Sequence, residues 1–160
     1  MNFREGDPVM HWTYGLGQII KLEERALSGS KNLYYAVKIQ DMTVWVPADN
    51  KLETRLRPPT PKAGFKKLLA ILSGPAEPLP EDRHERKTRL LELLKDGHAE
   101  SLCRIIRDLY AFQKAKPLNE NDQRILKQLR NVLLGEWGFS QSISQAQAEL
   151  ELQHSLEFET

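Results

Sequence analysis

Cysteine is nearly absent from this 160-residue chain, and long apolar runs are missing altogether. The single cysteine, Cys103, excludes an intramolecular disulfide and any zinc site built from several thiolates. No apolar run approaches the roughly 20 residues that a membrane-spanning helix needs. The first residues also lack the apolar core of a signal peptide. We therefore expect a soluble, cytoplasmic protein with no membrane contact.

Clustered catalytic residues are missing as well. The histidines are scattered without metal-ligand spacing: His11, His84, His98 and His154. Cys103 lies beside an apolar helical stripe, which indicates a buried packing thiol rather than a nucleophile. Gly15-Leu16-Gly17 is too short for a phosphate-binding loop and opens a strand rather than a helix. We expect a protein that is not an enzyme, with no cofactor, no metal and no small-molecule ligand.

Charge is balanced over the whole chain but uneven along it, since the formal net charge is only +1. Residues 1–60 carry eight Lys/Arg against seven Asp/Glu, and residues 61–130 carry fifteen against ten. Residues 131–160 carry five acidic residues and no Lys or Arg. A basic middle therefore precedes an acidic end, a pattern that the net charge conceals.

Residues 7–57 favour β structure. Four segments rich in β-forming residues, 9–12, 16–25, 33–39 and 43–47, are separated by short polar or glycine-containing turns. Gly15 and Gly17 supply the φ freedom of a tight bend, and residues 28–32 read as a hairpin loop. Four or five short strands in this length predict a small twisted barrel or meander. The proline-rich run Arg57–Pro61 is the expected boundary, giving domains 1–60 and 61–160.

After this boundary the apolar period becomes helical. A first helix is predicted by one apolar face, which consists of Phe65, Leu68, Leu69 and Leu72. Residues 81–96 predict a second helix, and residues 102–112 predict a third. Asn119 should cap a fourth helix, whose first-turn Glu120 and Asp122 suit the helix dipole. Residues 140–154 predict a weaker fifth helix ending in a frayed acidic tail. The fold class is α+β: a small β-barrel or meander followed by a compact all-α domain of about five helices.

Trp45 lies in the middle of Thr43-Val44-Trp45-Val46-Pro47. Strand alternation places Val44 and Val46 on one face and Thr43 and Trp45 on the other. Because the valines are the natural core pair, Trp45 should point outward, where an aromatic can anchor an interface. The alternative is that the helical domain covers Trp45, and alternation alone does not decide between the two.

The segment from Arg83 to Arg89 is basic and contains no apolar residue. It carries Arg83, His84, Arg86, Lys87 and Arg89 over two helical turns. A half-helix without apolar residues has no core to face, so we expect it at the surface. A solvated face is the usual explanation for such a run, and a phosphate-contacting edge is the alternative that the basic middle region supports.

Several motifs resemble the CarD/CdnL family of bacterial transcription regulators. They are the opening Phe3–His11, the Tyr14-Gly15-Leu16-Gly17 turn, Tyr34–Ile39, and Thr43–Asn50. In the second half, Ile105–Tyr110 and Lys116–Asp122 resemble the family's helical domain. The β-module is also similar to the polymerase-interacting domain of transcription-repair coupling factors. The resemblance extends to about Trp137 and depends on the order and spacing of the motifs.

The resemblance implies a Tudor-like β-domain that binds the RNA polymerase β subunit. The contact strand would be Thr43, Val44, Trp45 and Val46, which would add edge-on to a polymerase strand. Arg25 falls where the family often keeps a polymerase-contacting arginine. Trp45 departs from the arginine that some relatives carry at its position.

For the helical domain the resemblance implies contact with promoter DNA at the upstream edge of the transcription bubble. Some relatives insert a tryptophan wedge there, and Asp82 falls at that place in this chain. A carboxylate cannot act as an apolar wedge, so wedging does not transfer. Arg83, His84, Arg86, Lys87 and Arg89 are the candidate DNA contacts, and they predict weak, largely non-specific binding.

Three functions stay open on these residues. The first is a polymerase-bound regulator of transcription initiation, monomeric and associated with the nucleoid through the polymerase. The second is a stand-alone, non-specific DNA-binding protein. The third is a polymerase-binding adaptor without wedge activity. Activation, repression, promoter choice and further partners have no signature in the sequence.

Overall fold

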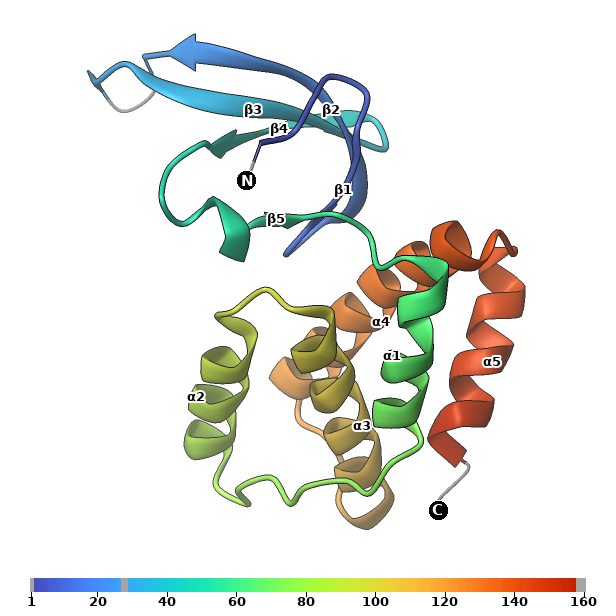
Figure 1. Cartoon of the computed structure of the whole chain (residues 1–160). Coiled ribbons are helices and arrows are strands. Elements are labelled where there is room, and N and C mark those ends of the chain that lie inside the picture. The colour runs from blue at the N-terminus through green and yellow to red at the C-terminus, as the bar shows by residue number, and fades with distance from the viewer. Residues whose placement is uncertain (1, 27–28, 158–160) are drawn as a thin grey trace. The chain divides into compact units, whose positions relative to one another are not determined.

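The computed structural model describes residues 2–26 and 29–157 and divides the chain into two compact units, Met1–Pro59 and Thr60–Thr160. We call them the sheet unit and the helical unit (Figure 1). The division falls one residue before the boundary expected from the proline-rich run. The α+β class is confirmed, with a Tudor-like sheet first and five α-helices after it.

The sheet unit is a five-stranded antiparallel sheet in the order β4-β3-β2-β1-β5. Its strands are β1 (Pro8–His11), β2 (Gly15–Arg25), β3 (Asn32–Ile39), β4 (Met42–Pro47) and β5 (Leu56–Arg57). A short 3-10 helix, η2 (Leu52–Thr54), precedes β5. The strands β4 and β5 therefore form the two edges. Part of the expected 28–32 loop, Ser28, lies outside the described residues.

The core of the sheet unit comes from one face of the strands, as alternation requires, and from Leu52 of η2. It consists of Val9, Ile19, Tyr35, Val37, Ile39, Val46, Leu52 and Leu56, with Val44 packed against it. The two glycines of the first turn serve different needs. Gly15 has a φ of 86°, whereas a Cβ on Gly17 would lie 2.6 Å from Ile39 Cγ1. Gly17 is thus required by close packing rather than by φ.

The helical unit opens with η3 (Lys62–Gly64) and contains α1 (Phe65–Leu72), α2 (Arg83–Leu94), α3 (Ala99–Ala115), α4 (Glu120–Gln141) and α5 (Gln145–Glu157). Helices α1, α2 and α4 pack on α3, and α5 packs on α4 and α1. Trp137 of α4 is buried against Phe65 of α1, with ring centroids 5.3 Å apart. The predicted helices are present, with shifted ends.

Two of these shifts have clear causes. The second helix begins at Arg83 rather than Glu81, because Asp82 has extended backbone and its carboxylate accepts the amide of Glu85 as a cap. The fifth helix begins at Gln145 rather than Ser140, because α4 continues to Gln141 and ends at Ser142, whose φ is 57°. The expected acidic tail beyond Glu157 lies outside the described residues.

Candidate binding surfaces

The first candidate surface is the outer face of the sheet unit beside the edge strand β4. Trp45 lies on this face, opposite to the buried Val46, so its predicted outward direction is confirmed. The side chain is half-buried. Within the described residues no further strand pairs with β4 on its outer side, so the backbone of Trp45 lies at a sheet edge.

Arg25 and Trp45 come from different strands and meet on this face. The Arg25 guanidinium carbon lies 4.1 Å from the centroid of the Trp45 ring, and Lys21 Nζ lies 5.9 Å from it. Register places Lys21 in line with Trp45, because both pair with Ala36 of β3. Arg25 pairs with Asn32, four residues away along β3, so its long side chain extends along the sheet to reach the ring. We call Lys21, Glu23, Arg25 and Trp45 the Trp45 face.

Lys21 also forms an ion pair with Glu23, with its Nζ 2.9 Å from a carboxylate oxygen. The hydrogen bond from Lys21 lowers the pKa of the Glu23 carboxyl group, and the charges of Lys21 and Arg25 add to the effect. The Trp45 face is therefore an aromatic ring with two cations over it and one carboxylate beside it. Such a surface suits an acidic or polar protein partner.

The second candidate surface belongs to α2, and there the structure separates the five basic residues. Arg86 is buried, with 4% of its surface exposed, so the expectation that the whole segment lies at the surface is wrong for this residue. It faces the core with Leu90, one helical turn on, which is also buried. The burial removes Arg86 from the residues available to a phosphate.

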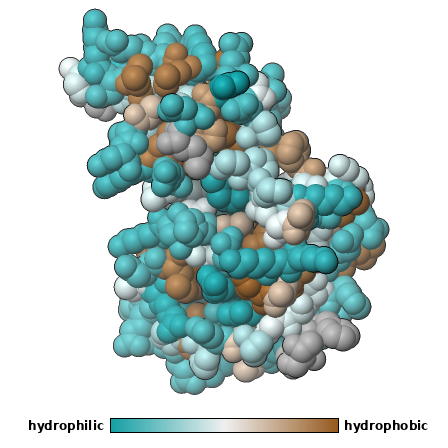
Figure 2. Space-filling view, viewed as in Figure 1, coloured by the Kyte–Doolittle hydropathy of each residue, from teal (hydrophilic) through white to brown (hydrophobic). Residues whose placement is uncertain are grey.

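The other four stay at or near the surface. Arg83, His84 and Lys87 line a hollow of about 470 Å³, together with Asn119, Glu120 and Asn121 at the start of α4. We call it the α2–α4 hollow. Arg89 points to the other flank and lies 3.4 Å from a carboxylate oxygen of Glu77. In the space-filling view the visible surface over α2 is mostly hydrophilic (Figure 2).

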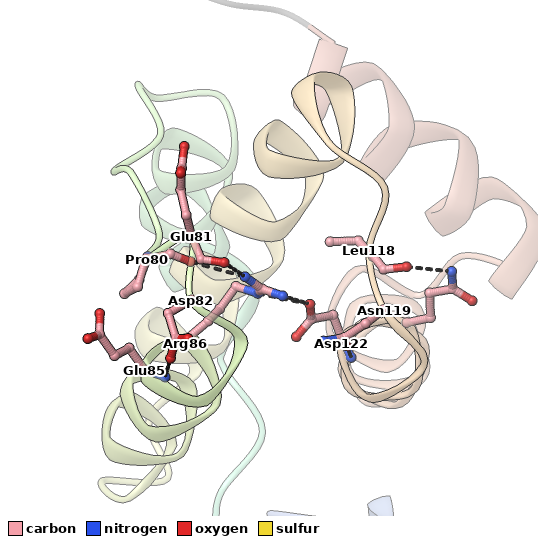
Figure 3. A network of polar contacts seen from close by, with 9 residues as sticks. Pro80, Glu81, Asp82, Glu85, Arg86, Leu118, Asn119 and Asp122 are labelled. Atoms are coloured by element: carbon pink, nitrogen blue, oxygen red, sulfur yellow. Dashed lines mark hydrogen bonds and ion pairs between the residues drawn. The ribbon is translucent and has the colours of Figure 1, made fainter.

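Sequence reasoning missed the partner of Arg86, which is Asp122 of α4 (Figure 3). Asp122 was assigned to the helix dipole, yet its side chain is fully buried. One signal was present. Asp122 falls in register with the apolar positions 126, 129 and 133, so it lies on the buried face of α4. A carboxylate on such a face requires a buried cation or donors.

Cys103 is buried in α3, consistent with a packing thiol. No three His, Cys, Asp or Glu side chains of the described ranges gather closely enough to hold a metal ion. No helix in the part of the chain that the structure describes has the length and apolar character to cross a membrane.

The structure thus has two modules, a Tudor-like sheet with an open edge strand and a helical unit with basic residues along α2. Comparison with known proteins agrees. Residues 3–58 match the CarD-like/TRCF RID domain, and residues 67–153 match the C-terminal domain of CarD. The chain therefore belongs to the CarD family.

One relative is similar over almost its full length. It is a protein of Bacillus subtilis (strain 168) named "Putative transcription factor YdeB". It is 26% identical over 148 residues, which cover 91% of this chain and 96% of the relative. The family match and this relative both describe a transcription regulator.

Proposed function

We propose that the protein regulates transcription initiation by binding the RNA polymerase β subunit through β4 and the Trp45 face. The observation that carries the proposal is the 4.1 Å contact between Arg25 and Trp45. Arg25 and Trp45 are two of the five residues that the family resemblance assigns to polymerase contact, and they come from strands β2 and β4 to form one surface. An edge strand supplies backbone groups for β-augmentation, and this surface beside it supplies the specificity.

The same proposal assigns a weaker DNA contact to Arg83, His84 and Lys87 in the α2–α4 hollow. Arg83 and Lys87 are separated by one helical turn, so both can lie along one phosphate backbone. Asp82 supports no wedge, because its carboxylate is engaged as the α2 cap. The DNA contribution is therefore electrostatic and largely independent of sequence.

The polymerase contact is tested by measuring, with calorimetry, the affinity of the full chain for the isolated β lobe of the polymerase. Trp45→Ala should weaken binding by roughly 30-fold, the equivalent of about 2 kcal/mol for an aromatic anchor. Arg25→Glu should also weaken it, since the guanidinium no longer covers the ring. Trp12→Ala is the matched control, because Trp12 is an exposed tryptophan of the same unit at the β1–β2 turn.

Failure of the unmodified chain to bind, or equal affinity for all variants, would refute the polymerase contact. The DNA contact is tested separately by the lifetime of promoter complexes with Arg83→Gln and Lys87→Gln. Arg104→Gln is their control, because Arg104 is an exposed arginine on α3.

A polymerase-binding adaptor without a DNA contact is the second candidate. Two observations favour it: Arg86 is buried, and Arg89 is paired with Glu77. It predicts promoter complexes whose lifetime does not change with Arg83→Gln or Lys87→Gln, while Trp45→Ala still weakens polymerase binding.

A further inference from the structure

Arg86 contacts three separate segments of the helical unit, two of them through hydrogen bonds and one through an aromatic ring. Its Nε and one terminal nitrogen lie 2.9 and 2.7 Å from Asp122 Oδ2 on α4. The other terminal nitrogen donates to the carbonyls of Pro80 and Glu81, at 3.1 and 3.0 Å. The guanidinium carbon also lies 4.7 Å from the ring centroid of Phe112 on α3. Figure 3 shows the side chain reaching from α2 towards α4.

The first turns of α2 have few other attachments to the core. Arg86 and Leu90 are the buried residues of this helix, and the residues around Arg86 are polar. The side chains of Arg86 and Asp122 are 5% and 1% exposed, so the pair is screened from water. Removing one partner leaves the other as a buried, uncompensated charge, which is strongly destabilising.

We propose that the Arg86–Asp122 pair is a positioning device that fixes the N-terminal half of α2 against α4. Arg83 and Lys87 are then held at the α2–α4 hollow, beside Asn119 and its neighbours. Arg86 touches no phosphate itself. This inference rests on the proposed DNA contact of Arg83 and Lys87, which it deepens by assigning the residues that orient them.

The chemistry of the site explains why the anchor is an arginine. A guanidinium presents five N–H donors in a rigid plane, so one group can bind a carboxylate and two carbonyls together. An ammonium cannot match that geometry. Lysine at this position should keep the ion pair and lose the ties to Pro80 and Glu81.

The test replaces the pair without leaving a buried charge. The double variant Arg86→Met/Asp122→Leu fills the same space with apolar groups, which buried ion pairs often tolerate. DNA affinity of the full chain is measured against salt, with and without Lys87→Gln. In the unmodified chain Lys87→Gln should lower the salt slope by about 0.9, the value for one phosphate contact. In the double variant, Lys87→Gln should leave the salt slope almost unchanged, because Lys87 is no longer held near the phosphate.

Two further variants separate positioning from direct contact and from loss of folding. Arg86→Lys should restore part of the Lys87 effect, because its charge still pairs with Asp122. Arg89→Met is the matched control: it removes a cation from the same helix, yet its partner Glu77 is exposed, so the Lys87 effect should persist. The burial of Trp137 allows its fluorescence to report that the helical unit stays folded.

An equal Lys87 effect in both backgrounds would overturn the inference. A Lys87→Gln change without effect in the unmodified chain would refute the DNA contact instead. In that case amide hydrogen exchange tests separately whether the Arg86–Asp122 pair fixes α2. In the double variant, exchange of the amides of residues 83–90 should become at least about tenfold faster, while α4 is unchanged. Unchanged exchange in α2 would overturn it.

Discussion

Acidification should lower the free energy of unfolding of the sheet unit, because it contains the buried His11. The loss should begin at a higher pH than the one at which carboxyl groups take up protons. His11 ends β1 and is almost fully buried. Its Nδ1 accepts hydrogen bonds from the backbone amides of Thr13 and Tyr14, whose nitrogens lie 3.0 and 3.2 Å away. Burial lowers the pKa of His11 from 6.5 to about 4. A proton added to the neutral ring would go to Nδ1 and remove both hydrogen bonds.

The sign and size of the effect follow from linkage. The folded pKa lies below the unfolded one, so the unfolded chain binds the extra proton first. The stability contributed by neutral His11 is complete above pH 6.5 and is lost as the pH falls from 6.5 towards 4. Between these values the loss reaches about 2 kcal/mol at about pH 5. The pKa values of the Glu23, Asp49 and Glu81 carboxyl groups are lowered. The stability that these groups contribute is therefore lost only when the pH falls below their ordinary pKa values.

The assay is urea unfolding at several pH values, followed by the indole N–H signals in NMR spectra. Trp12 and Trp45 report on the sheet unit, and the buried Trp137 reports on the helical unit. Between pH 7 and 5 the signals of the sheet unit should move to lower urea more than that of Trp137. In His11→Asn, whose amide oxygen can accept in place of Nδ1, this difference should disappear. A difference that persists in this variant would refute the assignment to His11.

Two stability predictions use the same assay. Gly17→Ala should destabilise the sheet unit by about 1–3 kcal/mol, because the new methyl group would meet Ile39 Cγ1 at 2.6 Å and the Lys38 carbonyl at 2.8 Å; an unchanged Trp45 midpoint would contradict the close packing. Asn119→Ala should lower the free energy of unfolding of the helical unit by about 1 kcal/mol, because the Asn119 side chain caps α4 by accepting a hydrogen bond from the amide of Asp122. The urea midpoint of the Trp137 signal measures this loss. Asn131→Ala, within the same helix, is the control.

Local patterns of the sequence carried much of the fold. Alternation predicted that Val46 faces the core and that Trp45 faces away, and both positions are confirmed. The cap at Asn119 was also predictable, because an asparagine before acidic first-turn residues is typical of a helix start. Such features depend on neighbours only a few residues away.

The candidate site was harder to predict, because its pairings are distant in sequence. Arg86 and Asp122 are 36 residues apart, and each looked like a solvated charge in its own segment. The meeting of Arg25 with Trp45 required the register of three strands, including the irregularity between Ile19 and Lys21. Hairpin signals show that strands pair, but they do not fix such a bulge.

The burial of Arg86 bears on how the protein could reach DNA at all. Of the basic residues of α2, Arg83 and Lys87 remain as full charges at the α2–α4 hollow. Two phosphate contacts predict a salt slope of about −1.8, so DNA affinity should fall only about tenfold between 50 and 200 mM salt. A stand-alone binder with many contacts would lose a thousandfold or more over that range. Under the proposed polymerase contact, two phosphate contacts would suffice, because polymerase would hold the helical unit beside the promoter and raise its local concentration there. A slope near −6 for the free chain would refute this reasoning and favour the stand-alone DNA-binding protein.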